Sequence, residues 1–165
     1  MQLDKFFQNF GLASIAAELV TLVLMLLAFS AVFWLLIGRF RLHNFLINIY
    51  ISMAILYVVP QDVMVFSKNA SILIFLIFLV LLTLMNKYLF DIHQSGSGMA
   101  LWQVFLMSFL EVVLLLSIIF SFLPTKDVLK YISKNSLGYF VDPWWAFAWM
   151  VLPLAFLIFV KKRDK

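Results

Sequence analysis

The chain has 165 residues, of which 65% are hydrophobic and 12% are charged, and its formal net charge is +4. A soluble domain is about one quarter charged, so this composition excludes an ordinary water-soluble fold. Because cysteine is absent, structural disulfides, thiolate metal sites and a cysteine nucleophile are excluded as well. Four of the twelve Lys and Arg lie in residues 161–165, which indicates the flank of a membrane span and argues against a nucleic-acid interface.

Amphipathic and long apolar segments alternate along the chain. Residues 2–10 show the pattern of a helix lying at a membrane surface, and residues 126–136 show it again. Between and after them, five apolar segments approach the ~20 residues needed to cross a hydrocarbon core. They cover residues 12–37, 44–65, 70–86, 100–123 and 143–160. We therefore predict an all-α integral membrane protein, a single domain over residues 1–165 with a bundle of five transmembrane helices and short interfacial helices.

The first apolar segment, 12–37, is too long for the ~7–15-residue core of a cleavable signal peptide, so we expect it to be retained as a span. The second, 44–65, is the weakest of the five, because Asn44, Asn48 and residues 60–62 interrupt it. It either crosses fully or re-enters, and re-entry would leave four spans.

Positive charges on alternate sides of the spans predict the orientation of the chain. Five spans place seven Lys and Arg inside and five outside, whereas four spans give six on each side. The count therefore favours five spans, with the N-terminus outside and the C-terminus inside a bacterial cytoplasmic membrane. The basic residues expected at the inner surface, where they set topology and attract anionic headgroups, are Arg39, Arg41, Lys161, Lys162 and Arg163.

The last apolar segment carries two prolines with different expected effects. Asp142 and Pro143 form a suitable N-cap and first helical residue. Pro153 lies inside the segment and should kink the helix unless a neighbour satisfies the carbonyl that it leaves free. Aromatic side chains near the start of this segment, Trp144, Trp145 and Trp149 among them, are typical of a membrane interface.

Glu111 stands almost at the centre of the fourth apolar segment, where a carboxylate is costly and marks a candidate functional site. Ser108 lies near it at helical spacing. A protonatable group here could bind or relay a proton or a cation. The alternative, which we favour because no second acid is central, is a neutral or hydrogen-bonded Glu that holds helices together or faces a partner subunit.

Three further intramembrane residues are polar candidates. Glu18, in the outer third of the first span, either lines a vestibule or reaches the headgroups, and we favour the second. Asn48 and Ser52 continue an i, i+4 polar stripe that begins at Asn44, and this stripe is the best candidate within the chain to meet Glu111. Helix-to-helix hydrogen bonding is again favoured over a substrate site.

No motif indicates catalysis or a cofactor. His43 and His93 stand apart and lack metal-ligand spacing, and no zinc-protease, serine-hydrolase, nucleotide or dinucleotide fingerprint is present. We expect no catalytic residues, no metal, no cofactor and no enzymatic activity.

Residues 12–137 resemble the colicin V production protein family in the order of their elements. The resemblance lies in a first span that ends in Gly38-Arg39, a short second span before an aromatic-rich third, a fourth span, and an amphipathic tail with Ser136-Leu137. The chain departs from that family in its scarcity of glycine and in the helix after Asp142. The resemblance implies a small bacterial inner-membrane protein that serves envelope maintenance or export.

Two functions follow as hypotheses. The first is a scaffold or accessory subunit that contacts the lipid bilayer and another membrane protein, or a second copy of itself. The second is a small proton- or cation-linked channel or transporter that uses Glu111.

Overall fold

The computed structural model describes residues 14–37, 42–60, 70–89, 100–130 and 132–163. Within these ranges the chain forms helices and no strand, which confirms the all-helical prediction for them. The predicted interfacial helix at residues 2–10 lies outside the described part of the chain. The helices are α2 (Ser14–Ile37), α3 (Leu42–Val58), α5 (Ala70–Leu89), α6 (Leu101–Phe122), α7 (Thr125–Val128), α8 (Lys134–Val141) and α9 (Pro143–Arg163).

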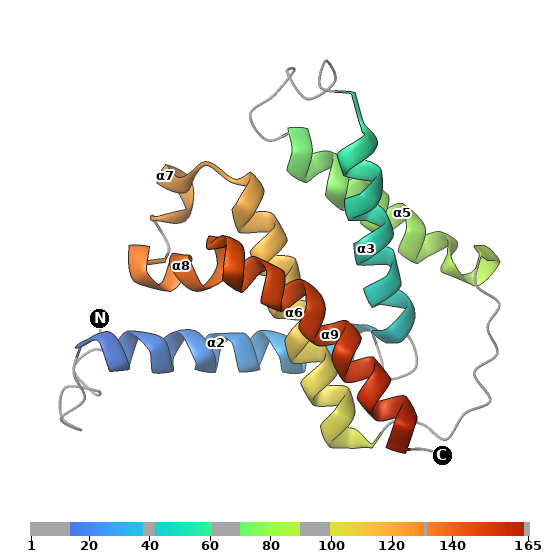
Figure 1. Ribbon diagram of the computed structural model, residues 1–165, viewed down its shortest axis with the longest axis horizontal. Helices are drawn as coiled ribbons and strands as arrows, with labels where there is room; N and C mark the ends of the chain where they lie inside the picture. The colour runs from blue at the N-terminus through green and yellow to red at the C-terminus, as the bar shows by residue number, and fades with distance from the viewer. Residues whose placement is uncertain (1–13, 38–41, 61–69, 90–99, 131, 164–165) are drawn as a thin grey trace.

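Helix α6 lies at the centre of the arrangement. It contacts α2, α3, α5, α8 and α9, so neighbours surround much of its length. Helices α3 and α5 cross as a pair on one side of it, α2 and α8 lie on the other, and α9 runs along it (Figure 1). A side chain in the middle of α6 is therefore in the middle of the molecule.

Two apolar clusters meet on α6. The first joins α6 to α3 and α5, with partly buried side chains from α2 and α9 packed around it. The second joins another face of α6 to α2 and α8. The fully or almost fully buried members of the first are Leu42, Leu46, Ile49, Leu56, Phe75, Val104, Met107, Leu114 and Ile118, and the second contains Leu26, Val112, Val113 and Phe140.

Hydrogen bonds from side chains to backbone carbonyls reinforce the second cluster. The Ser117 hydroxyl of α6 donates to the carbonyl of Phe140 on α8 at 2.6 Å, and this bond is buried. The indole nitrogen of Trp149 on α9 donates to the carbonyl of Tyr139, at 2.7 Å. These bonds attach the short helix α8 to both α6 and α9.

Helix α3 is shorter than the apolar segment 44–65. It begins at Leu42 and ends at Val58, just before Pro60. Proline has no N–H, and it disfavours helical geometry in the residue before it, so the helix stops here although the sequence stays apolar. Residues 61–65 of the predicted segment lie outside the described part of the chain.

The amphipathic segment 126–136 is not one helix. Helix α7 ends at Val128, and α8 begins at Lys134. The Ser133 hydroxyl accepts a hydrogen bond from the Ser136 N–H at 3.2 Å and so caps the N-terminus of α8. This local cap favours a new helix start over continuation of the first helix.

Helix α9 begins as predicted. The Asp142 carboxylate accepts a hydrogen bond from the Trp144 N–H at 3.0 Å, which confirms Asp142 as the N-cap and Pro143 as the first helical residue. Pro153 is fully buried inside α9, which continues as a helix on both sides of it.

Candidate functional site

Glu111 is completely buried, with 0% of its surface exposed. The reason is its register on α6, where Val104, Met107, Leu114 and Ile118 recur at spacings of three and four residues and all enter the first cluster. Residues at these spacings share a helix face, and Glu111 stands in the middle of that face. The carboxyl group is thus placed inside an apolar cluster by the same periodicity that builds the cluster.

Neither carboxyl oxygen of Glu111 has a hydrogen-bond partner among the described residues. An isolated ionised carboxylate in an apolar interior costs far more free energy than its neutral form. The surroundings described here therefore favour the neutral acid, and a change in its charge requires either a partner or a rearrangement.

Three other predicted candidates are also fully buried. Ser108, Asn48 and Ser52 each have 0% exposure, and each carries a side-chain oxygen without a hydrogen-bond partner in the described part of the chain. Ser108 lies three residues from Glu111 on α6, whereas the other two lie on α3. The buried unpaired oxygens therefore belong to the two helices that the sequence singled out.

The predicted contact between the α3 stripe and Glu111 is not formed as a hydrogen bond. The Asn48 amide nitrogen instead donates to the Thr83 hydroxyl on α5, at 3.4 Å. Thr83 in turn donates to the Leu79 carbonyl of its own helix, at 2.6 Å. Helix α3 packs closely against α5, and Asn48 of the stripe makes its hydrogen bond to that helix.

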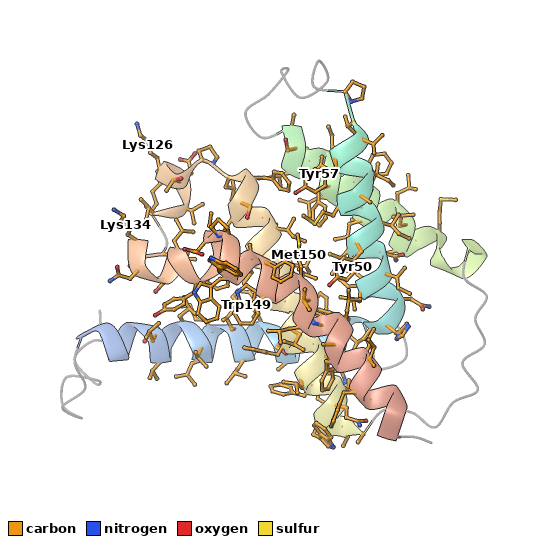
Figure 2. All side chains as sticks on the ribbon, in the orientation of Figure 1. Tyr50, Tyr57, Lys126, Lys134, Trp149 and Met150 are labelled. Atoms are coloured by element: carbon orange, nitrogen blue, oxygen red, sulfur yellow. The ribbon has the colours of Figure 1, made fainter. Side chains whose placement is uncertain are left out.

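Tyr50 makes a contact between helices that the sequence did not reveal. Its ring is partly buried on α3, and its hydroxyl donates a hydrogen bond to the carbonyl of Met150 on α9. Figure 2 shows Tyr50 and Met150 approaching each other from their two helices.

The Tyr50 hydrogen bond falls next to the break that Pro153 makes in the hydrogen bonding of α9. Pro153 has no N–H to donate to the carbonyl four residues earlier, that of Trp149. Tyr50 donates to the following carbonyl, that of Met150. A neighbouring helix thus supplies a donor at this turn, although not to the carbonyl that Pro153 leaves free.

The remaining predicted residues cannot be compared in the same way. Arg39 and Arg41 lie outside the described residues, and so do the side chains of Glu18 and of the basic residues at the end of α9, Lys161, Lys162 and Arg163. Over the ranges that are described, no group of three or more His, Cys, Asp or Glu could hold a metal ion.

Two of the described helices are long and apolar enough to cross a membrane. They are α6 over Leu101–Phe122 and α9 over Pro143–Val160. Shorter apolar helical stretches occupy Leu19–Leu35, Leu42–Val58 and Ala70–Met85.

No protein-family model, no curated protein and no solved structure matches the chain.

Proposed function

We propose that the chain is a multipass membrane protein of the bacterial cytoplasmic membrane and acts there as a scaffold or accessory subunit. The observation that carries this proposal is the apolar outer surface of α2, α5 and α9. Large hydrophobic side chains are exposed along all three helices, among them Phe29, Leu35, Ile77, Leu84, Phe147 and Ile158. Soluble monomers rarely expose contiguous apolar surface of this kind, so lipid or another membrane protein is its natural cover.

Helix lengths support four of the five proposed spans. At 1.5 Å per residue, the 24 residues of α2 and the 22 of α6 reach roughly 36 and 33 Å, and the 20 of α5 and the 21 of α9 reach roughly 30 Å, against a hydrocarbon core of about 30 Å. Helix α3, with 17 residues, reaches roughly 26 Å, which is shorter than the hydrocarbon core. To cross, it requires local thinning of the bilayer or flanking polar side chains that extend toward the headgroups.

The contrast between the burial of α6 and the exposure of α5 and α9 supports the accessory role. Helix α6 is covered by its neighbours over much of its length, whereas bulky side chains on α5 and α9 are exposed within the described chain. Such faces suit packing against a second membrane protein or a second copy. A role in envelope maintenance or export agrees with the resemblance to the colicin V production proteins.

Crosslinking in the native membrane tests the scaffold proposal. A photoreactive residue at Leu84 or Ile158, both exposed, should capture a defined partner that also co-purifies in a mild detergent. The same residue at the fully buried Leu114 is the matched control and should capture nothing. A monodisperse monomer, with no crosslinked product from either exposed position, would contradict the proposal.

A second function, a proton- or cation-linked channel or transporter, is favoured by one observation, the buried and unpaired carboxyl of Glu111. The full chain reconstituted in liposomes should then show a flux that Glu111→Gln abolishes. Asp127→Asn is the matched control, because Asp127 is an exposed acid paired with Lys130 at 2.6 Å. Equal flux in the wild type and Glu111→Gln would eliminate this function.

A further inference from the structure

Helices α7 and α8 each have a buried apolar side and an exposed cationic side. Val128 on α7 and Leu137 and Phe140 on α8 are buried. Lys126 on α7 and Lys134 on α8 are exposed, and Figure 2 shows both projecting away from the body of the molecule. The two helices are therefore anchored through apolar side chains and present positive charge outward.

The charge on this outward side is not balanced within the described part of the chain. Lys130, just after α7, is paired with Asp127 at 2.6 Å, whereas Lys126 and Lys134 form no ion pair with a described residue. The other acid of residues 125–142, Asp142, caps the N-terminus of α9. Lys134 is also the first residue of α8, where the helix dipole disfavours a positive charge. Contacts within the described chain therefore do not explain these two lysines.

A column of aromatic rings follows at the junction of α8 and α9. The ring of Tyr139 on α8 meets that of Trp145 on α9 edge-on, with centroids 5.6 Å apart, and Trp145 stacks on Trp149 at 6.0 Å. The Trp149 indole N–H donates to the Tyr139 carbonyl at 2.7 Å, which holds the two helices together at the column. Trp144, in the first turn of α9, is 82% exposed. Such rings, apolar with a polar N–H or O–H, suit the boundary between hydrocarbon and headgroups.

The lysines and the aromatic column lie at one end of the two helices that are long and apolar enough to cross a membrane. Helix α6 ends at Phe122, α9 begins at Pro143, and α7 and α8 lie between them in the chain. Figure 1 shows α7, α8 and the start of α9 gathered near the end of α6. In a bilayer, the hydrocarbon core gives way to headgroups at the ends of the spans. The unbalanced lysines are thus placed at the level of lipid phosphates.

We propose that α7, α8 and the first turn of α9 form a binding surface for anionic phospholipid headgroups, in which Lys126 and Lys134 contact the lipid phosphates. This inference rests on the proposed membrane location of the chain and names the lipid class that this end of the molecule binds. The aromatic column sets the depth of the surface, and each lysine adds attraction to a negative headgroup. A zwitterionic headgroup carries an ammonium group that repels lysine, so the surface favours an anionic lipid such as phosphatidylglycerol.

Photocrosslinking in nanodiscs tests the proposal. The full chain is placed in bilayers of equal parts phosphatidylglycerol and phosphatidylcholine with identical acyl chains. A photoreactive residue replaces Leu129, which is exposed and lies between Lys126 and Lys134 in the sequence. Mass spectrometry should show about a fivefold excess of captured phosphatidylglycerol, the factor that corresponds to about 1 kcal/mol for a lysine at an anionic surface. The same residue at Ile77, exposed on α5, should capture both lipids in bulk proportion.

Two double variants distinguish the loss of charge from the loss of a lysine side chain. Lys126→Gln/Lys134→Gln removes the unbalanced charge, so the excess at Leu129 should fall to the bulk proportion. Asp127→Asn/Lys130→Gln is the matched control, because it removes a lysine together with its paired acid and leaves the net charge unchanged, so it should keep the excess. All four substituted side chains are exposed, and thermal unfolding in detergent checks that both variants are folded.

Three results would overturn the proposal. They are equal capture of the two lipids at Leu129, an excess that survives Lys126→Gln/Lys134→Gln, and capture of a second copy of the chain in place of lipid. Any of these, with lipid captured at Ile77, would reject the headgroup surface and keep the membrane location. Absence of captured lipid at both Leu129 and Ile77 would reject the membrane location as well.

Discussion

Glu111 is the buried carboxyl group on which the proposed transport function depends. Glu111 has 0% exposure, and its oxygens accept no hydrogen bond from the described residues. In such a place the neutral acid is tolerated at modest cost, whereas a permanent charge is not. The side chain that replaces Glu111 therefore matters less for its size than for its charge.

Substitution of Glu111 should separate charge from shape. Glu111→Gln keeps the size and stays neutral, so we expect the free energy of unfolding in mild detergent to change by less than about 1 kcal/mol. Glu111→Lys introduces an obligatory buried charge at low pH and should cost about 3–5 kcal/mol, the scale measured for an uncompensated buried charge. Thermal unfolding of the purified variants measures both, and equal stabilities would contradict the assigned burial.

Ser117 and Ser121 form a matched pair on α6. The Ser117 hydroxyl donates across the helix interface to the Phe140 carbonyl, whereas Ser121 donates to the Ser117 carbonyl of its own helix at 2.7 Å. Ser117→Ala leaves a buried carbonyl with one acceptor position unfilled and should lower the free energy of unfolding by about 1–2 kcal/mol. Ser121→Ala should be nearly neutral, and unfolding in detergent compares the two.

For single residues, the sequence predicts which side chains are unusual in an apolar segment, but it does not predict which residues they contact. Glu111 could be predicted because an acid within a long apolar run is conspicuous whatever the fold. Tyr50 could not, because its importance depends on a contact with Met150, 100 residues away. The stripe that contains Asn48 was expected to meet Glu111, whereas Asn48 donates to Thr83, because a period along one helix does not determine which neighbouring helix it faces.

At the scale of the helix, the caps determine where elements begin and end. Asp142→Ala removes the side chain that accepts from the Trp144 N–H, so we expect a loss of about 1 kcal/mol in the free energy of unfolding. Asp127→Ala breaks only an exposed pair with Lys130 and should cost nothing measurable to about 1 kcal/mol at most. Circular dichroism during thermal unfolding compares them, and a larger effect at Asp127 would count against the cap.

A helix boundary could be predicted from the sequence where one or two adjacent residues determine it. The Asp142-Pro143 pair predicts the start of α9 because both residues act on the first turn alone. Pro60 ends α3 at Val58 by the same kind of local effect, although the apolar run suggested a longer helix. The division between α7 and α8 was not predicted, because a single capping residue, Ser133, is a weaker sequence signal than the amphipathic pattern of residues 126–136.

At the scale of the whole molecule, the first apolar cluster joins α6 to the α3–α5 pair. Phe75 on α5 is fully buried in the first cluster, and Leu84 on the same helix is 74% exposed. Phe75→Ala leaves a cavity and should cost about 3 kcal/mol or more, whereas Leu84→Ala removes no buried contact. Unfolding in detergent distinguishes the two, and comparable losses would mean that α5 packs differently.

The proposed membrane assignment concerns the whole molecule. In it, lipid or a partner protein covers the exposed apolar faces of α2, α5 and α9, and α6 and α9 are the described helices long and apolar enough to cross a bilayer, whereas α3 is the shortest of the five proposed spans. If α3 crosses the membrane, its buried polar residues lie within the hydrocarbon core, as those of α6 do. If it re-enters, every later connection changes sides, so the orientation of the whole chain depends on this helix.

Cysteine accessibility in intact cells tests the five-span arrangement most directly, because the chain has no cysteine of its own. Single substitutions at Arg41, Asp62, Gln94 and Lys130 place one thiol in each connection. A membrane-impermeant thiol reagent should label Asp62→Cys and Lys130→Cys from outside, and Arg41→Cys and Gln94→Cys only after permeabilisation. Labelling of Asp62→Cys on the same side as Arg41→Cys, with the later positions reversed, would contradict five spans.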